Sequence, residues 1–365
     1  MLNYNKSYKF ELYVGGRCNF KCRYCFEPDS PWSKINTDLK LDQVMRYTEF
    51  IKYIINSIND KSLTYNVSAL GGETLLYIDL LLPLAKALKN DIIDLTIVTN
   101  GALLLKKIKE IMYLKRVLNN GVTIITSYDF IHQDMTRQKG TYQLIRNHIK
   151  MIANRGFNPV CITVFEGDTL PLAWERFEDF LKLKEEIPNL VVKFNLSRNV
   201  DAFDGMNEDL AREALSKIRD YIGNDVELAS SFLYNPSFMY RQNRLEHAFF
   251  GSTLLGMSID GNVFPGYDVP FISDFAKDTL ILGNINDNFE DLENRRRQLM
   301  ATLPIDPPQK CINCSAVCRV LPWARMTDSI EQYNMSPDAK HCYIHKLVSE
   351  YLPYKRTYLG LDDAI

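Results

Sequence analysis

Residues 10–26, FELYVGGRCNFKCRYCF, join an apolar stretch to a loop with three closely spaced cysteines. Residues 10–14 predict a strand, and Cys18, Cys22 and Cys25 follow it as C-x3-C-x2-C. Three thiolates can hold three irons of a [4Fe-4S] cube and leave the fourth iron open to a small bidentate ligand. A closed zinc knuckle is the alternative, but zinc normally takes four ligands and no fourth Cys or His lies nearby in the sequence.

Length and composition indicate a globular chain. Its 365 residues allow about two domains, or one large barrel with an appendage. With 43 Lys and Arg against 45 Asp and Glu, the net charge of -2 provides no overall field for nucleic acid or an anionic membrane. No stretch approaches the ~18 apolar residues of a membrane span, and the N-terminus lacks a signal-peptide pattern. We therefore expect a cytoplasmic protein whose eight cysteines serve metal or redox chemistry rather than disulfides.

Strand and helix patterns alternate through the first two thirds of the chain. The predicted strands are residues 10–14, 65–70, 95–99, 122–128, 160–165 and 191–196. The predicted helices are residues 41–56, 78–89, 103–118, 142–154 and 172–184. Since parallel strands need crossover helices, a repeat of roughly 30 residues predicts a parallel sheet. An open barrel is favoured over a flat sheet, although the spacing alone does not decide between them.

After about residue 230 the sequence becomes richer in aromatics, Pro and Gly, and the predicted elements become short. Residues 257–264 predict a hairpin that turns at Asp260-Gly261, where glycine supplies a positive φ. A second cysteine group follows, made of Cys311, Cys314, Cys318 and Cys342. Four thiolates suit either a fully ligated [4Fe-4S] cluster or structural zinc. We predict two domains, residues 1–235 and 236–365.

The N-terminal motifs resemble those of radical S-adenosylmethionine (SAM) enzymes. In that family a C-x3-C-x2-C loop with aromatic neighbours, here Tyr24 and Phe26, follows the first strand, and a motif such as Gly71-Gly72-Glu73 follows the second. The resemblance implies a partial (β/α)6 barrel of the TIM type with SAM bound at the carboxyl ends of its strands. The implied ligands of the SAM-binding cluster are Cys18, Cys22 and Cys25.

The same resemblance assigns SAM contacts to later strand ends. The implied cofactor-binding residues are Tyr24, Phe26, Gly71, Gly72, Glu73, Thr99, Asn100, Ser127, Asp129 and Val164. In this assignment Gly71, Gly72 and Glu73 meet the methionine amino group, Ser127 reaches the ribose, and backbone groups around Val164 frame the adenine. Asn100 and Asp129 are equally compatible with turn and cap roles.

The C-terminal region resembles the SPASM extension of many radical SAM enzymes. Residues 256–265 correspond to its hairpin, and residues 282–285 to its following Gly-Asn segment. The resemblance implies a smaller α+β domain with one auxiliary [4Fe-4S] cluster on Cys311, Cys314, Cys318 and Cys342. Gly266 and Pro322 stand where a complete SPASM region has further cysteine ligands. We therefore predict two clusters in total.

Three residues are candidates for chemistry on the substrate. Tyr267 and Asp268 lie where related sulfatase-maturing enzymes have an Asp that takes a substrate proton, and a surface loop is the alternative. Cys161 lies in a predicted apolar strand, where a packed thiol is the default. Its alternative role as a hydrogen-atom donor requires the side chain to point into the barrel lumen.

The resemblance implies a radical SAM enzyme that reductively cleaves SAM to a 5'-deoxyadenosyl radical. The first choice of substrate is a peptide or protein, with maturation by crosslinking, thioether formation, epimerisation or oxidation. A dehydrogenase or rearrangement enzyme for a small molecule is the alternative, and a non-catalytic iron-sulfur or zinc protein that binds a partner is a third. A flavodoxin- or ferredoxin-type electron donor is also expected.

Overall fold

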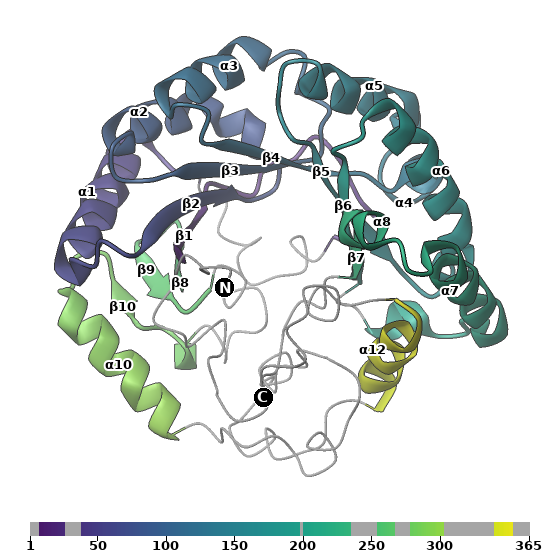
Figure 1. Cartoon of the computed structure of the whole chain (residues 1–365). Coiled ribbons are helices and arrows are strands. Elements are labelled where there is room, and N and C mark those ends of the chain that lie inside the picture. Colours follow the sequence, from purple (N-terminus) through teal and green to yellow (C-terminus); the bar gives the residue numbers. More distant parts are fainter. Residues whose placement is uncertain are drawn as a thin grey trace.

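The computed structural model describes residues 7–25, 38–197, 200–234, 254–266, 278–302 and 339–352. These residues build one curved sheet with its helices on the outer side (Figure 1). The strand order is β10-β9-β8-β1-β2-β3-β4-β5-β6-β7. The predicted α/β fold, a partial barrel with a parallel sheet, is confirmed.

Every pairing from β1 to β7 is parallel. The strands are β1 (Ser7–Tyr13), β2 (Thr64–Leu70), β3 (Asp94–Thr99), β4 (Val122–Ser127), β5 (Val160–Phe165), β6 (Val191–Leu196) and β7 (Phe232–Tyr234). The register aligns Phe10 with Val67 and Leu12 with Ala69, so alternate side chains of neighbouring strands share one face. Six of these strands coincide with the predicted ones.

Helices cross over between the strands and cover the outer face of the sheet (Figure 1). The longer ones are α1 (Leu41–Ile58), α2 (Ile78–Leu88), α3 (Ile108–Val117), α5 (Tyr142–Ala153), α6 (Ala173–Glu186) and α7 (Glu208–Ile222). Short elements are η2 (Thr74–Tyr77), η3 (Phe130–His132), α4 (Gln133–Thr136), η4 (Leu170–Leu172), η5 (Val200–Phe203) and α8 (Val226–Ser231). The helix predicted from residue 103 begins at Ile108 instead, because residues 101–107 form turns above the end of β3.

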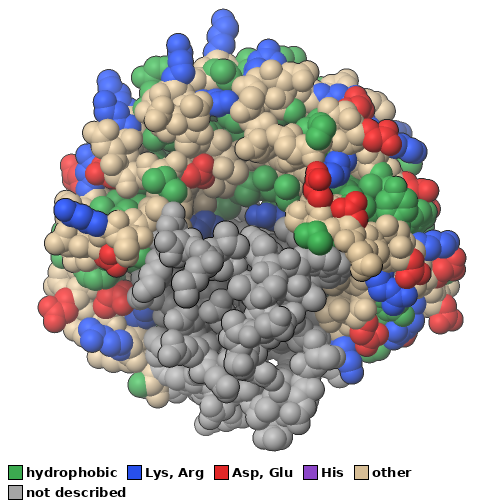
Figure 2. Space-filling view, in the orientation of Figure 1, with side chains coloured by type: hydrophobic (Ala, Val, Ile, Leu, Met, Phe, Trp, Pro, Cys, Tyr) green, Lys and Arg blue, Asp and Glu red, His purple; other side chains and the backbone are tan. Residues whose placement is uncertain are grey.

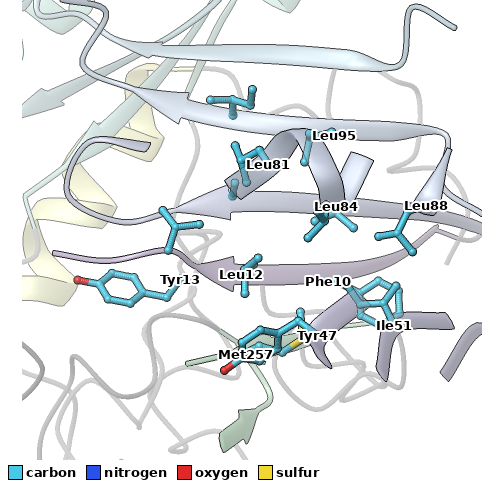
Figure 3. Packing of buried hydrophobic residues seen from close by; sticks show 14 of the residues in the cluster. Phe10, Leu12, Tyr13, Tyr47, Ile51, Leu81, Leu84, Leu88, Leu95 and Met257 are labelled. Atoms are coloured by element: carbon cyan, nitrogen blue, oxygen red, sulfur yellow. The ribbon is translucent and has the colours of Figure 1, made fainter. Parts of the chain in front are cut away.

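The core lies between the sheet and the helices. Figure 3 shows Phe10 and Leu12 of β1 pointing toward Tyr47 and Ile51 of α1, with Met257 beside them. Tyr47 and Met257 are at most 1% exposed, and the other three are fully buried. Burying each such side chain contributes about 1.5–3 kcal/mol, so this layer holds the strand ends in place.

The predicted hairpin is present, and it extends the barrel sheet. It consists of β8 (Leu254–Met257) and β9 (Asn262–Phe264), which β10 (Gly283–Asn284) joins in antiparallel pairing. β8 pairs in parallel with β1, on the edge opposite β2. Two further helices are α10 (Phe289–Thr302) and α12 (Ala339–Tyr351), and Leu347 and Val348 of α12 join the buried cluster around α7. The predicted division at residue 235 stays a prediction.

The outer surface mixes both signs of charge over the helices, as Figure 2 shows for one face. This agrees with the small net charge of -2. None of the described helices is long and apolar enough to cross a membrane.

Candidate functional site

The three N-terminal cysteines lie in residues 14–25, which we call the cysteine loop. It leaves the carboxyl end of β1, where loops of a parallel barrel converge. Cys18 is exposed, Cys22 and Cys25 are half-buried, and the amide of Cys25 donates to the carbonyl of Cys22 at 3.2 Å. Burial raises the pKa of the Cys22 thiol, and the charge of Arg137 acts against that rise.

Gly71 and Gly72 let the end of β2 pack directly against this loop. The amide of Gly72 donates to the carbonyl of Gly15 at 2.9 Å, and the amide of Glu73 donates to the carbonyl of Arg17 at 2.8 Å. A Cβ on Gly72 would lie 2.5 Å from the Arg17 oxygen, and one on Gly71 would lie 2.5 Å from the Gly15 oxygen. In this structure the space above both glycines is therefore taken by backbone of the cysteine loop.

Hydrogen bonds of Glu73 and Asn100 link the cysteine loop and the end of β2 to the end of β3. The buried Glu73 carboxylate accepts from the Thr99 hydroxyl at 2.6 Å, from the Asn100 amide at 2.7 Å and from the Leu75 amide at 3.0 Å. Burial raises the pKa of Glu73 although these three donors lower it. The Asn100 side chain donates to the Asn19 side chain at 2.8 Å and to the Cys18 sulfur at 3.7 Å. Both residues thus position the loop from the ends of β2 and β3.

Asp129, just after β4, is a buried carboxylate that accepts several hydrogen bonds, one of them from Tyr24. One carboxylate oxygen accepts from the Tyr24 and Thr136 hydroxyls, both at 2.6 Å. The other accepts from the Thr163 hydroxyl at 3.2 Å and the Val164 amide at 3.0 Å. Asp129 is fully buried, so it acts on the site by holding Tyr24 rather than from an open surface. Its predicted direct contact with SAM stays a prediction.

A buried arginine of α6, Arg176, lies next to the Asp129 carboxylate. Arg176 is fully buried, with Nη1 3.6 Å from an Asp129 oxygen and its guanidinium 4.2 Å from the centre of the Phe165 ring. Burial by itself would raise the pKa of Asp129, but Arg176, Arg137 and the hydrogen bonds together lower it. Arg176 also donates to the Val164 carbonyl at 2.6 Å. Since the Val164 amide donates to Asp129, both backbone groups of Val164 have partners inside the protein, and the framing of adenine by backbone groups around Val164 stays a prediction.

The remaining predicted residues on β4 and β5 divide between the two faces of the sheet. Ser127 is half-buried at the end of β4, paired in register with Ile162. Cys161 is fully buried among Ile149, Phe180 and other side chains between β5 and the helices. This burial supports the interpretation of Cys161 as a packed thiol, and its alternative role as a hydrogen-atom donor stays a prediction. Burial raises its pKa well above the ordinary range, as expected for a packed thiol.

Several predicted residues lie outside the described part of the chain. They are Phe26, Tyr267, Asp268, Cys311, Cys314 and Cys318. Cys342 falls within α12, but its side chain is not among those described. The auxiliary cluster and the acid-base pair therefore stay predictions.

Besides Arg176, two further arginines in the site were missed from the sequence. Arg137 donates to the Tyr24 hydroxyl at 2.7 Å, and among the described residues nothing accepts a hydrogen bond from its Nε. Arg23 lies between Cys22 and Cys25 and binds Glu166 and Asp168 beyond β5. The position of Arg23 between two ligand candidates was an available signal, whereas Arg137 lies eight residues after Asp129 in no recognisable pattern.

By its chemistry the donor set suits an iron-sulfur cluster with one open iron, although among the described residues no three Cys, His, Asp or Glu side chains are gathered closely enough to hold a metal ion. Three thiol side chains are carried by one loop, and the adjacent strand ends hold that loop by the hydrogen bonds above. Cysteine thiolates are the ordinary ligands of such clusters. The nearby Arg137 guanidinium offsets part of the negative charge that deprotonated cysteines bring.

Comparisons with known proteins agree with this geometry. Residues 12–184 match the family model "Radical SAM superfamily". Radical SAM cyclopropyl synthase TigE of Paramaledivibacter caminithermalis is 32% identical over 154 residues, 39% of this chain and 31% of that protein. GTP 3',8-cyclase of Aliarcobacter butzleri is 35% identical over 108 residues, 28% of this chain and 31% of that protein. The chain thus matches about a third of the length of these curated relatives.

Solved structures share the fold over a larger part of the chain. anSMEcpe with bound AdoMet and Cp18Cys peptide has a TM-score of 0.64 at 16% identity, covering 99% of this chain and 100% of that one. Streptococcus suis SuiB bound to precursor peptide SuiA has a TM-score of 0.59 at 15% identity, covering 89% and 76%. The match to this family implies a [4Fe-4S] cluster and SAM as cofactors. Over residues 12–184 this chain is therefore similar to the radical SAM superfamily.

Proposed function

We propose that the chain is a radical SAM enzyme whose cluster is held by Cys18, Cys22 and Cys25. The observation that carries the proposal is the attachment of the cysteine loop to the carboxyl ends of β2, β3 and β4 by the contacts of Gly72, Asn100 and Asp129. A loop held by rigid strand ends gives the cluster a fixed frame on which its ligands can be positioned. When bound, the cluster with SAM supplies one-electron cleavage of SAM and so begins radical chemistry.

In this proposal the residues around the cysteine loop bind and orient the cluster and SAM. Asn100 directs an N–H group at the Cys18 sulfur, and hydrogen bonds to cluster sulfurs tune a reduction potential. Arg137, which donates to the Tyr24 hydroxyl, brings a positive charge near the Cys22 sulfur. Ser127 and Val164, at the ends of β4 and β5, supply further surface for SAM on the same edge of the sheet. The cysteine set at 311–342 holds the auxiliary cluster in this proposal.

The cluster assignment is tested by iron and sulfide counts. Anaerobically reconstituted protein should hold about eight irons per chain if both clusters form. Replacing all three N-terminal cysteines by alanine should remove about four, with the far-ultraviolet circular dichroism spectrum unchanged, because Cys18 is exposed and Cys22 and Cys25 are only half-buried. Replacement of Cys161 by alanine is the matched control and should leave the count unchanged, since that thiol packs in the core. An unchanged count in the triple variant would refute the assignment.

The proposed substrate is a peptide or protein. Two structural neighbours of the whole chain carry peptides according to their descriptions, the Cp18Cys peptide in anSMEcpe and SuiA in SuiB. The similarity to a GTP cyclase favours a small molecule as the second candidate. Electrons would come from a flavodoxin- or ferredoxin-type donor.

The substrate class can be tested with deuterated extracts. Reduced enzyme and SAM are incubated with extract from cells grown in heavy water, with or without prior digestion by a protease that is inactivated before the enzyme is added. A hydrogen atom taken from the substrate appears as deuterium in 5'-deoxyadenosine. A signal that protease removes supports the peptide, and a signal that survives protease contradicts it in favour of a small molecule.

A further inference from the structure

We propose that Arg23 is a positioning residue that ties the far end of the cysteine loop to the carboxyl end of β5 through Glu166 and Asp168. The inference rests on the proposed function, since it concerns how the loop presents Cys22 and Cys25. β1 and β5 are separated by three strands in the sheet. A contact from the loop of one to the end of the other therefore spans the mouth of the barrel.

All three nitrogens of the Arg23 guanidinium donate hydrogen bonds. Nε of Arg23 donates to Glu166 Oε2 at 2.7 Å, while Nη1 and Nη2 donate to the two oxygens of Asp168 at 2.8 and 2.7 Å. Three charge-assisted hydrogen bonds fix the plane and the direction of the side chain. The backbone of Arg23 is held too, because its amide donates to the carbonyl of Thr136 at 3.0 Å. This set of bonds is called the Arg23 tie below.

The receiving loop after β5 is itself fixed. The amide of Glu166 donates to the Thr169 hydroxyl at 2.8 Å, and its carbonyl accepts from the Leu170 amide at 2.8 Å. The amide of Gly167 donates to the carbonyl of Ala202 at 2.8 Å, which joins this loop to η5 beyond β6. The Arg23 side chain therefore binds a segment that is itself fixed to the barrel by hydrogen bonds.

The two acidic partners contribute unequally. The side chain of Glu166 is 8% exposed and that of Asp168 is 58% exposed, with Arg23 at 39%. Solvent and salt screen the bond to Asp168, whereas the bond to Glu166 is screened much less. Removal of Arg23 also leaves the buried Glu166 carboxylate without its cation, which costs more than the loss of a surface pair. The tie therefore acts mainly through Glu166, with Asp168 setting its direction.

The test compares Arg23→Gln with Lys21→Gln, a change at an exposed cation of the same loop. The first readout is amide hydrogen exchange of residues 15–25 in protein without iron, and the second is the rate of iron release from reconstituted protein to a chelator. Arg23→Gln should speed both by about tenfold, the order expected for losing hydrogen bonds to a buried charge. Lys21→Gln should behave as wild type, and Arg23→Lys, which lacks the fork, should rescue only in part.

A double-mutant comparison of Arg23 and Glu166 distinguishes the loss of the Arg23 tie from a general loss of stability. Glu166→Gln alone should reproduce most of the effect from outside the cysteine loop, and Arg23→Gln combined with Glu166→Gln should be no worse than Arg23→Gln. The electron paramagnetic resonance spectrum of the reduced N-terminal cluster should shift in Arg23→Gln and be restored toward wild type by Arg23→Lys.

Exchange and iron release equal to wild type in Arg23→Gln would overturn the inference, as would strictly additive effects of the two changes. Failure of the proposed function gives a different result, because wild-type protein would then take up no iron at residues 18–25. Amide exchange in iron-free protein would still measure the tie in that case. If Arg23→Gln fails to fold, Glu166→Gln and Asp168→Asn carry the same test.

Discussion

Replacing Asp129 by asparagine should be among the most destabilising changes in the barrel. Asp129 and Arg176 are both fully buried, and their charged atoms are 3.6 Å apart. The Asp129→Asn change would leave the Arg176 cation without its counter-charge, and breaking a buried pair from one side costs about 3–5 kcal/mol. The new amide group would also direct N–H groups at donors that now give to a carboxylate, either Tyr24 and Thr136 or the Val164 amide.

The assay is urea unfolding of iron-free protein, followed by circular dichroism, with Glu213→Gln as the control. Glu213 pairs with Lys217 on the surface, both more than half exposed, so its loss should change the free energy of unfolding by under about 0.5 kcal/mol. The pKa of Asp129 is lowered by folding, so its contribution is fully present above the ordinary value of ~3.9 and is lost only as pH falls through the folded pKa. Titration of Asp129 itself should therefore add no pH dependence to the difference in unfolding free energy between about pH 5 and pH 7. A loss below about 1 kcal/mol would refute the reasoning.

Three further changes test separate parts of the site. Gly72→Ala places a Cβ 2.5 Å from the Arg17 oxygen and should lower iron incorporation several-fold. Gly140→Ala strains a backbone with a φ of +79° but has open space around it and lies away from the cysteine loop, so it should not alter iron content. Cys161→Ala should leave the yield of 5'-deoxyadenosine and of product unchanged at a stability cost of about 1 kcal/mol, because the thiol is buried among core side chains, and a lost product would contradict this. Burial, together with Arg176, lowers the pKa of His132 below its ordinary ~6.5, so the folded state binds fewer protons and stability should fall as pH drops from about 7 to 5. His132→Gln should flatten that slope in urea titrations, and an unchanged slope would exclude His132 as its source.

The sequence predicted the barrel because its signals are local. Apolar runs such as residues 160–165 and amphipathic stretches such as residues 142–154 have the periods of a strand and a helix, and the structure places elements there. The hairpin turn at Asp260-Gly261 is equally local, and Gly261 has a φ of +87°. The parallel pairing of β8 with β1 joins residues about 245 positions apart, so no local pattern contains it.

The roles inside the site were harder to predict than its location. Motif positions placed Glu73, Asn100 and Asp129 at one edge of the sheet, as the structure has them. The structure shows their polar atoms turned toward the protein, where they hold the cysteine loop and the chain around Val164. Which partner a carboxylate finds depends on side chains from several strands, such as Arg176 and Thr163, that are remote in the sequence. Burial decides these roles, and burial is a property of the whole fold.

The most direct test of the account is SAM cleavage by dithionite-reduced, anaerobically reconstituted protein. Wild type should convert SAM to 5'-deoxyadenosine, and the protein with Cys18, Cys22 and Cys25 replaced by alanine should form none above the level without protein. Cleavage by the triple variant at the wild-type rate would contradict the assignment of the site to this loop. No cleavage by iron-loaded wild type would contradict the proposed function itself.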